Sequence, residues 1–188
     1  HEIAALTQGV VIPTTFYVAT NGNDAASGDY DHPWRSLSNS ANRVAGGSTL
    51  VVRGGEYREE VVVNNSTLSP TNRLTIMAYE NEVPVIKASD VATTWTLDSG
   101  SVWKTTWSVK PQQVFVDGAP LQMIGPINAY FNAHPSRCTQ IGTDRNDMYP
   151  GTFFYDTQTQ TLYVWLEDGS NPSSHLMEVS RRAWCLNA

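Results

Sequence analysis

The chain has 188 residues, a formal net charge of −6 at pH 7 and 40% hydrophobic residues. Its 12 Lys and Arg residues are scattered along the sequence, which excludes the clustered basic surface that nucleic-acid binding requires. No run of about 18 apolar residues occurs, so we expect no membrane-spanning helix and no membrane partner. The length suits one domain with a smaller extension packed beside it.

The first third of the chain predicts an arm, one strand and one helix. Residues 1–15 are weakly patterned and are interpreted as an arm. Residues 16–19 are rich in β-forming side chains and predict a short strand, which leads into a turn-dense loop. Apolar residues recur at helical spacing over 34–44, which predicts a single helix with Trp34 on its buried stripe.

From residue 48 onward the pattern changes to short strands. Strands are predicted over 48–53, 59–63, 74–78 and 83–87, with a corner at Gly54-Gly55. Their β-branched residues form continuous runs, as in parallel strands that are buried on both faces. This favours a solenoid of stacked coils whose open end is capped by the 34–44 helix, and the alternative is a β-sandwich.

The segment 95–174 is interpreted as a small inserted antiparallel sheet. Residues 113–116 predict a strand that ends in an Asp117-Gly118 turn, and 152–156 with 161–166 predict a hairpin. Residues 177–180 return to the rhythm of the coils, so 175–188 is interpreted as the start of the resumed solenoid. The domain organisation we expect is 1–15, 16–94, 95–174 and 175–188.

Two features leave alternatives open. Cys138 and Cys185 allow either one disulfide in an oxidising compartment or two buried free thiols. No cofactor is predicted, although Asn21, Asn23, Asp24 and Asp29 could offer oxygens to calcium, and turn formation is the default role of such residues.

Several stretches resemble a known family. Phe-Tyr-Val at 16–18, Asn-Gly-Asn-Asp at 21–24, His-Pro-Trp-Arg-Ser-Leu at 32–37 and the segment 47–59 resemble the opening of secreted, right-handed parallel β-helix proteins of the pectin-lyase-like type. The stretches at 112–118, 154–156, 162–164 and 178–182 resemble the insertion of β-xylosidase-like glycoside hydrolases, whose coils are interrupted by an outer β-sandwich. The resemblance covers nearly all of 16–184.

The resemblance implies a mainly β fold, made of the N-terminal cap and first coils of a parallel β-helix with a small inserted antiparallel sheet. In such proteins the catalytic carboxylates typically follow the insertion. It therefore implies an N-terminal fragment, inactive alone, of a secreted or cell-surface glycoside hydrolase that acts on a polysaccharide or oligosaccharide. A non-catalytic carbohydrate-binding module and an adhesin-like segment are the alternatives, and the negative charge disfavours pectin or alginate as the ligand.

Candidate site residues follow from these chemistries. Glycoside hydrolysis needs two carboxyl groups at a fixed separation, and no pair in the sequence stands out, so no catalytic residue is assigned. The long segment 122–150 gathers aromatic and hydrogen-bonding side chains that suit a sugar. The candidate ligand-binding residues are Trp103, Trp107, Tyr130, His134, Arg137, Asp144, Asp147 and Tyr149, and Arg145 lies among them. The alternative is that the segment packs as a surface loop and that the two tryptophans anchor the inserted sheet.

Overall fold

The computed structural model describes residues 14–125 and 140–187, which divide into two compact units. Unit 1 holds the described residues up to Ala88 together with 183–187, and unit 2 holds those from Ser89 to Arg182. Each unit has its own cluster of buried apolar side chains. None of the helices in the described residues is long and apolar enough to cross a membrane.

Unit 1 is a parallel β-solenoid, which confirms the predicted fold class. One sheet contains β1 (Thr15–Val18), β2 (Thr49–Val52) and β5 (Thr75–Ala78), all parallel and in the order β1-β2-β5. A second parallel pair joins β3 (Gly55–Tyr57) to β6 (Pro84–Ile86), and a third joins β4 (Val61–Val62) to β16 (Leu186–Asn187). Strands β2, β3 and β4 therefore form one coil, and β5, β6 and β16 stack on it as the next.

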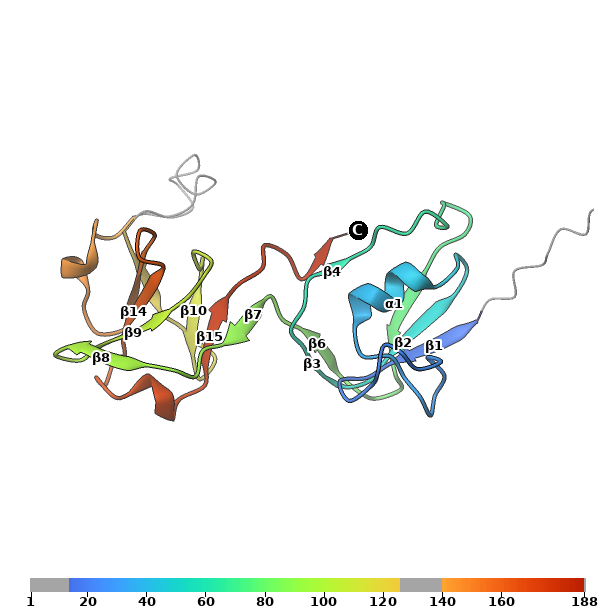
Figure 1. The fold of residues 1–188 in the computed structure, drawn as a ribbon, viewed down its shortest axis with the longest axis horizontal. Helices are drawn as coiled ribbons and strands as arrows, with labels where there is room; N and C mark the ends of the chain where they lie inside the picture. The colour runs from blue at the N-terminus through green and yellow to red at the C-terminus, as the bar shows by residue number, and fades with distance from the viewer. Residues whose placement is uncertain (1–13, 126–139, 188) are drawn as a thin grey trace, which may run out of the picture. The chain divides into compact units, whose positions relative to one another are not determined.

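That second coil is interrupted by unit 2. The chain leaves the coil after β6 and returns to it only at β16, which lies beside β4 (Figure 1). The predicted return at 177–180 is wrong, because β15 (Met177–Ser180) pairs antiparallel with strands of unit 2. Met177 and Val179 are fully buried in the core of that unit, which holds the strand there.

The helix α1 (Leu37–Arg43) covers the core of unit 1, as expected for a cap. It is shorter than predicted, because Ser36 is its N-cap and Trp34 lies before it, in a bridge with Val18. Trp34 is nevertheless a core residue with 4% of its surface exposed. The strand predicted over 59–63 is reduced to β4, since Glu59 turns away from the strand to bind the first turn of α1.

Unit 2 contains two sheets packed around one core. The first has the strand order β12 (Gln122–Ile124), β13 (Thr152–Asp156), β14 (Thr161–Trp165), β9 (Val102–Thr106) and β8 (Thr96–Ser99). The second has the order β11 (Ala119–Pro120), β10 (Val114–Val116), β15 and β7 (Ser89–Val91). Phe153 and Leu162 from the first sheet meet Val114 and Val179 from the second in the core. Short 3₁₀ helices, η1 (Arg145–Asp147) and η2 (Pro172–Ser174), lie in the connections.

Two local predictions in this unit are confirmed. β13 and β14 form the expected antiparallel hairpin, and β10 and β11 are joined at Asp117-Gly118, with φ of 49° and 83°. Positive φ at both central residues is what an Asp-Gly hairpin turn requires. The unit extends from 89 to 182 and not from 95 to 174, because β7 and β15 pair with each other at its two ends.

Candidate functional site

Three of the predicted ligand-binding residues, Tyr130, His134 and Arg137, lie outside the described residues, as does Cys138. Their roles, and the Cys138–Cys185 bridge, stay predictions. Cys185 itself is exposed.

Trp103 on β9 and Trp107, directly after that strand, lie on the same side, as the strand parity predicts, but that side packs into the core of unit 2. Trp107 is only 9% exposed, and the Arg181 guanidinium lies 5.6 Å from its ring centroid. Trp103 packs against the same core, and its indole N–H is buried without a hydrogen-bond partner among the described residues. This placement favours the anchoring alternative, because little of the Trp107 side chain is exposed to a ligand.

Asp144 and Asp147 cap the short helix η1. The Asp144 side chain accepts a hydrogen bond from the Asn146 N–H, and the Asp147 carboxylate accepts from the backbone N–H groups of Thr143 and Asp144. These backbone donors hold the pKa of Asp147 below its ordinary value. The two carboxylates therefore shape the turn. Tyr149 follows them with 44% of its surface exposed.

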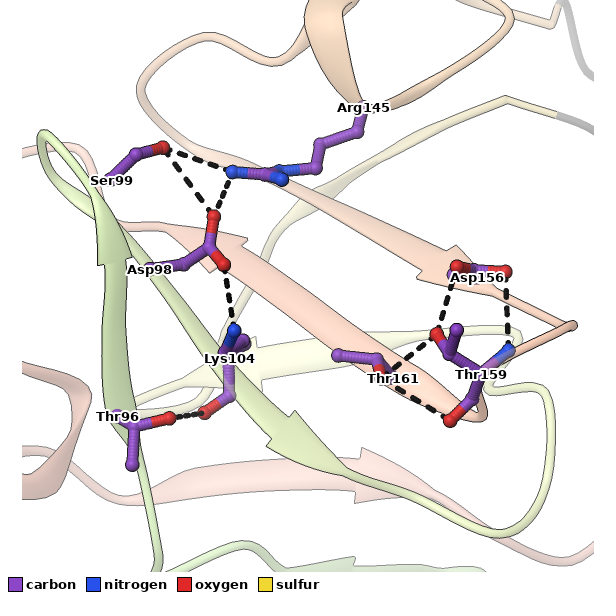
Figure 2. Close-up of polar contacts among 8 residues, drawn as sticks. All are labelled: Thr96, Asp98, Ser99, Lys104, Arg145, Asp156, Thr159 and Thr161. Atoms are coloured by element: carbon purple, nitrogen blue, oxygen red, sulfur yellow. Dashed lines mark hydrogen bonds and ion pairs between the residues drawn. The ribbon is translucent and has the colours of Figure 1, made fainter.

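The side chain between these two caps, Arg145, belongs to a charged cluster on the five-stranded sheet. Its guanidinium contacts the carboxylate of Asp98 and lies 2.9 Å from the Ser99 hydroxyl, while Lys104 Nζ lies 2.9 Å from Asp98 Oδ1 (Figure 2). The Arg145 guanidinium also lies 4.7 Å from the Tyr163 ring centroid. We call Asp98, Ser99, Lys104, Arg145 and Tyr163 the Asp98 cluster.

A β-bulge positions the carboxylate of this cluster. The pairing of β8 with β9 changes register between Leu97 and Ser99, so Asp98 is the extra residue. Bulges re-aim side chains and are over-represented beside functional sites. The Asp98 side chain is 11% exposed, whereas those of Lys104 and Arg145 are 42% and 38% exposed. The arrangement thus buries the acceptor and leaves two cationic donors at the surface.

Chemically, the Asp98 cluster suits the binding of a polar ligand better than its hydrolysis. Lys104 and Arg145 offer N–H donors to hydroxyl oxygens beside the aromatic ring of Tyr163. The contacts of Asp98 within the described residues are to Lys104, Arg145 and Ser99. None of them is the second carboxylate that an acid–base pair for glycoside hydrolysis requires.

A second hydrogen-bonded chain in unit 2 has the order of a nucleophile, a base and an acid. Ser170 Oγ lies 2.8 Å from His175 Nε2, and His175 Nδ1 lies 2.7 Å from Asp117 Oδ2. Acyl transfer would also need N–H donors aimed at a developing oxyanion. The N–H of Ser170 instead donates to Asp168 and that of Gly169 donates to the Leu166 carbonyl. We assign these three hydrogen-bonded side chains a structural role, which is to tie the Asp117 turn to the segment that precedes β15.

Three of the four residues considered for calcium, Asn23, Asp24 and Asp29, accept hydrogen bonds from backbone N–H groups. Asp24 accepts hydrogen bonds from the N–H groups of Arg35 and Ser36, and Asp29 accepts from those of Asp31 and His32. The described residues hold no group of three or more His, Cys, Asp or Glu side chains that could bind a metal ion. Asp29 therefore shapes a turn, whereas Asp24 ties its loop to the residues that precede α1.

Comparison with known proteins shows which solved structures have a similar fold. No protein-family model matches the chain. One curated relative, the uncharacterized protein YwoF of Bacillus subtilis (strain 168), is 36% identical over 76 residues, which are 40% of this chain and 16% of that protein. The complex of XylC with xylose superposes with a TM-score of 0.69 at 21% identity, covering 92% of this chain and 32% of that one.

A further solved structure, described as a glycoside hydrolase, superposes with a TM-score of 0.60 at 12% identity, over 88% of this chain and 45% of that one. The chain therefore spans less than half the length of each protein it matches. At these identities the two structural likenesses establish the fold, a mainly β chain with a β-solenoid and an inserted antiparallel part.

The sequence alone places Arg145 among the candidate ligand-binding residues but does not indicate Asp98, Lys104 or Tyr163. Asp98 and Arg145 are 47 positions apart in the sequence, and the contact arises only because η1 returns over the sheet. One local signal was present. The sequence Asp98-Ser99-Gly100-Ser101 is a tight connection between two strands, where a bulge is common.

Proposed function

We propose that this chain is the cap, first coils and inserted unit of a secreted or cell-surface glycoside hydrolase that acts on polysaccharide. The catalytic carboxylate pair belongs, in this proposal, to further coils that stack beyond β5, β6 and β16. The inserted unit contributes polar and aromatic contacts to the glycan, among them the Asp98 cluster. The chain alone binds glycan without cleaving it.

The observation that carries the proposal is the interruption of one solenoid coil by a two-sheet unit between β6 and β16. The likeness to XylC, which was solved with xylose, extends over 92% of the chain and so includes residues of both units. Fold likeness alone is a weak guide to chemistry. In this chain a second observation supports the proposal, because the Asp98 cluster offers the polar and aromatic groups that bind hydroxyl-rich ligands.

The edge of the solenoid supports the presence of further coils. Leu50 and Ile76 are register partners on neighbouring strands, yet Leu50 is fully buried and Ile76 is 38% exposed. An apolar groove of about 410 Å³ lies beside Ile76, lined by Val63, Leu68, Ser69, Arg73, Leu74 and Leu186. A solenoid core is completed by the coil that stacks on it. We therefore assign this groove to a following coil of the same protein.

Five of the described carboxylates have pKa values shifted in the direction opposite to that of a general acid. Hydrogen bonds lower the pKa values of these five carboxylates. Those of Asp29, Asp147, Asp156 and Asp168 accept from residues of their own turns, and that of Asp117 accepts from His175 and the Leu176 N–H. Glycoside hydrolysis needs one carboxyl group with a raised pKa as the general acid. None of these five residues has the properties of that acid.

The experiment compares two proteins. The 188-residue chain and the longest protein that its gene encodes are incubated with xylan, β-glucan, pectin and alginate, and reducing ends and unsaturated products are measured. We expect the longer protein to release reducing ends from a neutral polysaccharide and the 188-residue chain to release none. Release by the 188-residue chain would show that it contains its own acid pair. Unsaturated products would indicate a lyase, and binding without turnover by both proteins would indicate a binding module.

A further inference from the structure

Three tyrosines gather on the outer side of the solenoid. Tyr17 comes from β1, Tyr79 follows β5, and Tyr30 comes from the loop between β1 and α1. Tyr17 meets Tyr30 edge-on with ring centroids 5.3 Å apart, and Tyr79 lies 5.9 Å from Tyr30. Tyr30 is 49% exposed, so about half of its surface is available to a ligand.

Strand register explains why these side chains face outward. Val18 and Val52 are core residues of β1 and β2, so their neighbours in sequence point to the opposite face. The backbone N–H of Arg53 continues the β1–β2 hydrogen-bond ladder by donating to the Val18 carbonyl. The backbone N–H of Tyr79 donates in the same way to the Val52 carbonyl. The Arg53 guanidinium consequently lies 4.5 Å from the Tyr79 ring centroid and 5.5 Å from that of Tyr30.

Glu82 neutralises and fixes that guanidinium. Both Nε and Nη2 of Arg53 donate to the Glu82 carboxylate, at 3.0 Å and 2.7 Å from Oε1, and the Gly54 N–H donates to Oε2 at 2.6 Å. These bonds lower the pKa of Glu82, so the pair stays ionised at neutral pH. A bidentate Arg–carboxylate pair is rigid, which preorganises the wall that it forms.

An open cleft of about 660 Å³ lies against this wall, and Thr20, Asn21, Tyr30, Asp31, Arg53 and Glu82 line it. This volume lies within the range of small-molecule sites, in which aromatic rings are combined with a few polar groups. The charges of Arg53 and Glu82 cancel, so the exposed carboxylate of Asp31 is the charge that remains in the lining of the cleft. The cleft therefore carries no unpaired positive charge to attract a uronate or another anion.

We propose that this tyrosine cleft, named for Tyr30 in its lining, is a binding subsite for a neutral glycan chain. The apolar C–H face of a pyranose packs on the exposed Tyr30 ring, and the sugar hydroxyls meet the polar groups of Thr20, Asn21 and Asp31. The inference rests on the proposed function, because it adds to the glycan-active protein a second contact surface that lies on the solenoid itself.

The test is isothermal titration of the 188-residue chain with xylohexaose, cellohexaose and hexagalacturonate. We expect binding of a neutral hexasaccharide that weakens about three- to tenfold in Tyr30→Ala, the loss expected for one aromatic contact. Tyr30→Phe keeps the ring and should stay within about twofold of the wild type. Trp184→Ala is the control, since Trp184 is an aromatic side chain of the same unit that is 61% exposed and does not line the cleft.

The outcomes separate the subsite from the proposed function. Unchanged neutral-glycan affinity in Tyr30→Ala overturns the subsite, and a loss in Trp184→Ala would then move the contact outside the cleft. Absence of binding by the wild-type chain also overturns the subsite, even if the longest gene product cleaves xylan and so upholds the proposed function. If that product neither binds nor cleaves any of the glycans, both proposals fail. Circular dichroism of each variant verifies that the fold is intact.

Discussion

The carboxylate of Glu59 accepts a hydrogen bond of 2.9 Å from the backbone N–H of Leu37, 22 positions earlier in the sequence. The same carboxylate accepts from the Ser38 N–H at 2.9 Å and from the Ser36 hydroxyl at 3.1 Å. The first N–H groups of a helix have no partner within the helix. The coil that α1 covers therefore supplies them, which couples the formation of the cap to that of the coil.

Replacing Glu59 with Ala should destabilise unit 1. Two amide donors in the first turn of α1 would lose their acceptor, which costs about 1–2 kcal/mol of unfolding free energy. Urea unfolding measures this loss, and the amides of Leu37 and Ser38 should show faster hydrogen exchange. Glu60→Ala is the control, because the helix contacts come from Glu59 alone of the two. Equal stability of both variants would contradict the coupling.

Gly28 and Gly47 provide a matched pair for backbone strain in the same unit. Their φ angles are 81° and 84°, so alanine at either position costs about 1–2 kcal/mol. A Cβ on Gly28 would lie 2.4 Å from the buried indole of Trp34, whereas one on Gly47 meets only the Asn72 side chain at 2.9 Å. Gly28→Ala should therefore cost about 1–3 kcal/mol more than Gly47→Ala in urea unfolding. Similar losses would show that the Trp34 ring can shift.

Local sequence signals predicted the parts of the fold that local physics determines. The Asp117-Gly118 turn, the β13–β14 hairpin and the burial of Trp34 follow from residue type and spacing alone. The partner of β15 did not follow, because a four-residue strand of alternating apolar and polar residues does not indicate which strand it pairs with. Its assignment to a resumed coil failed for that reason.

The candidate site was less predictable for the same physical reason. Asp144 and Asp147 were selected for residue type, yet caps are formed by the same short carboxylates that bind ligands. The Asp98 cluster and the tyrosine cleft both depend on contacts between distant segments. Tyr17 and Tyr79 are brought to one face only by the parallel stacking of β1, β2 and β5.

The Asp117–His175 contact predicts an acid-dependent loss of stability. The hydrogen bond from His175, with the Leu176 N–H, lowers the pKa of Asp117 from its ordinary 3.8. A carboxylate with a lowered folded-state pKa stabilises the fold above its unfolded value, and this contribution is lost as the pH falls through the folded-state pKa. Wild type should thus exceed Asp117→Asn in unfolding free energy at neutral pH, and the difference should shrink as the pH falls below 3.8.

Urea titrations of both proteins across that pH range measure the difference. Asparagine tolerates the left-handed backbone of residue 117, so the turn itself is preserved. Asp31→Asn, at an exposed side chain, serves as the control for the loss of one carboxylate charge. A constant gap between wild type and Asp117→Asn would contradict the role of the ionised carboxylate.

The charge balance of the tyrosine cleft predicts a change of specificity in Glu82→Gln. Arg53 would lose its carboxylate partner while keeping its position beside Tyr30 and Tyr79. An unpaired guanidinium binds carboxylates, so affinity for hexagalacturonate should rise by about tenfold relative to cellohexaose. The gain should diminish at high salt, which screens exposed charges. Glu60→Gln should leave both affinities unchanged, and an unaltered ratio in Glu82→Gln would show that Arg53 does not face the ligand.

The most direct measurement of the central claim is a glycan microarray probed with the 188-residue chain. The account predicts signals on neutral plant oligosaccharides such as xylan and glucan fragments, reduced in Tyr30→Ala, with little signal on uronate-rich glycans. A fully folded chain that binds no glycan on the array, or that binds acidic glycans alone, would contradict it.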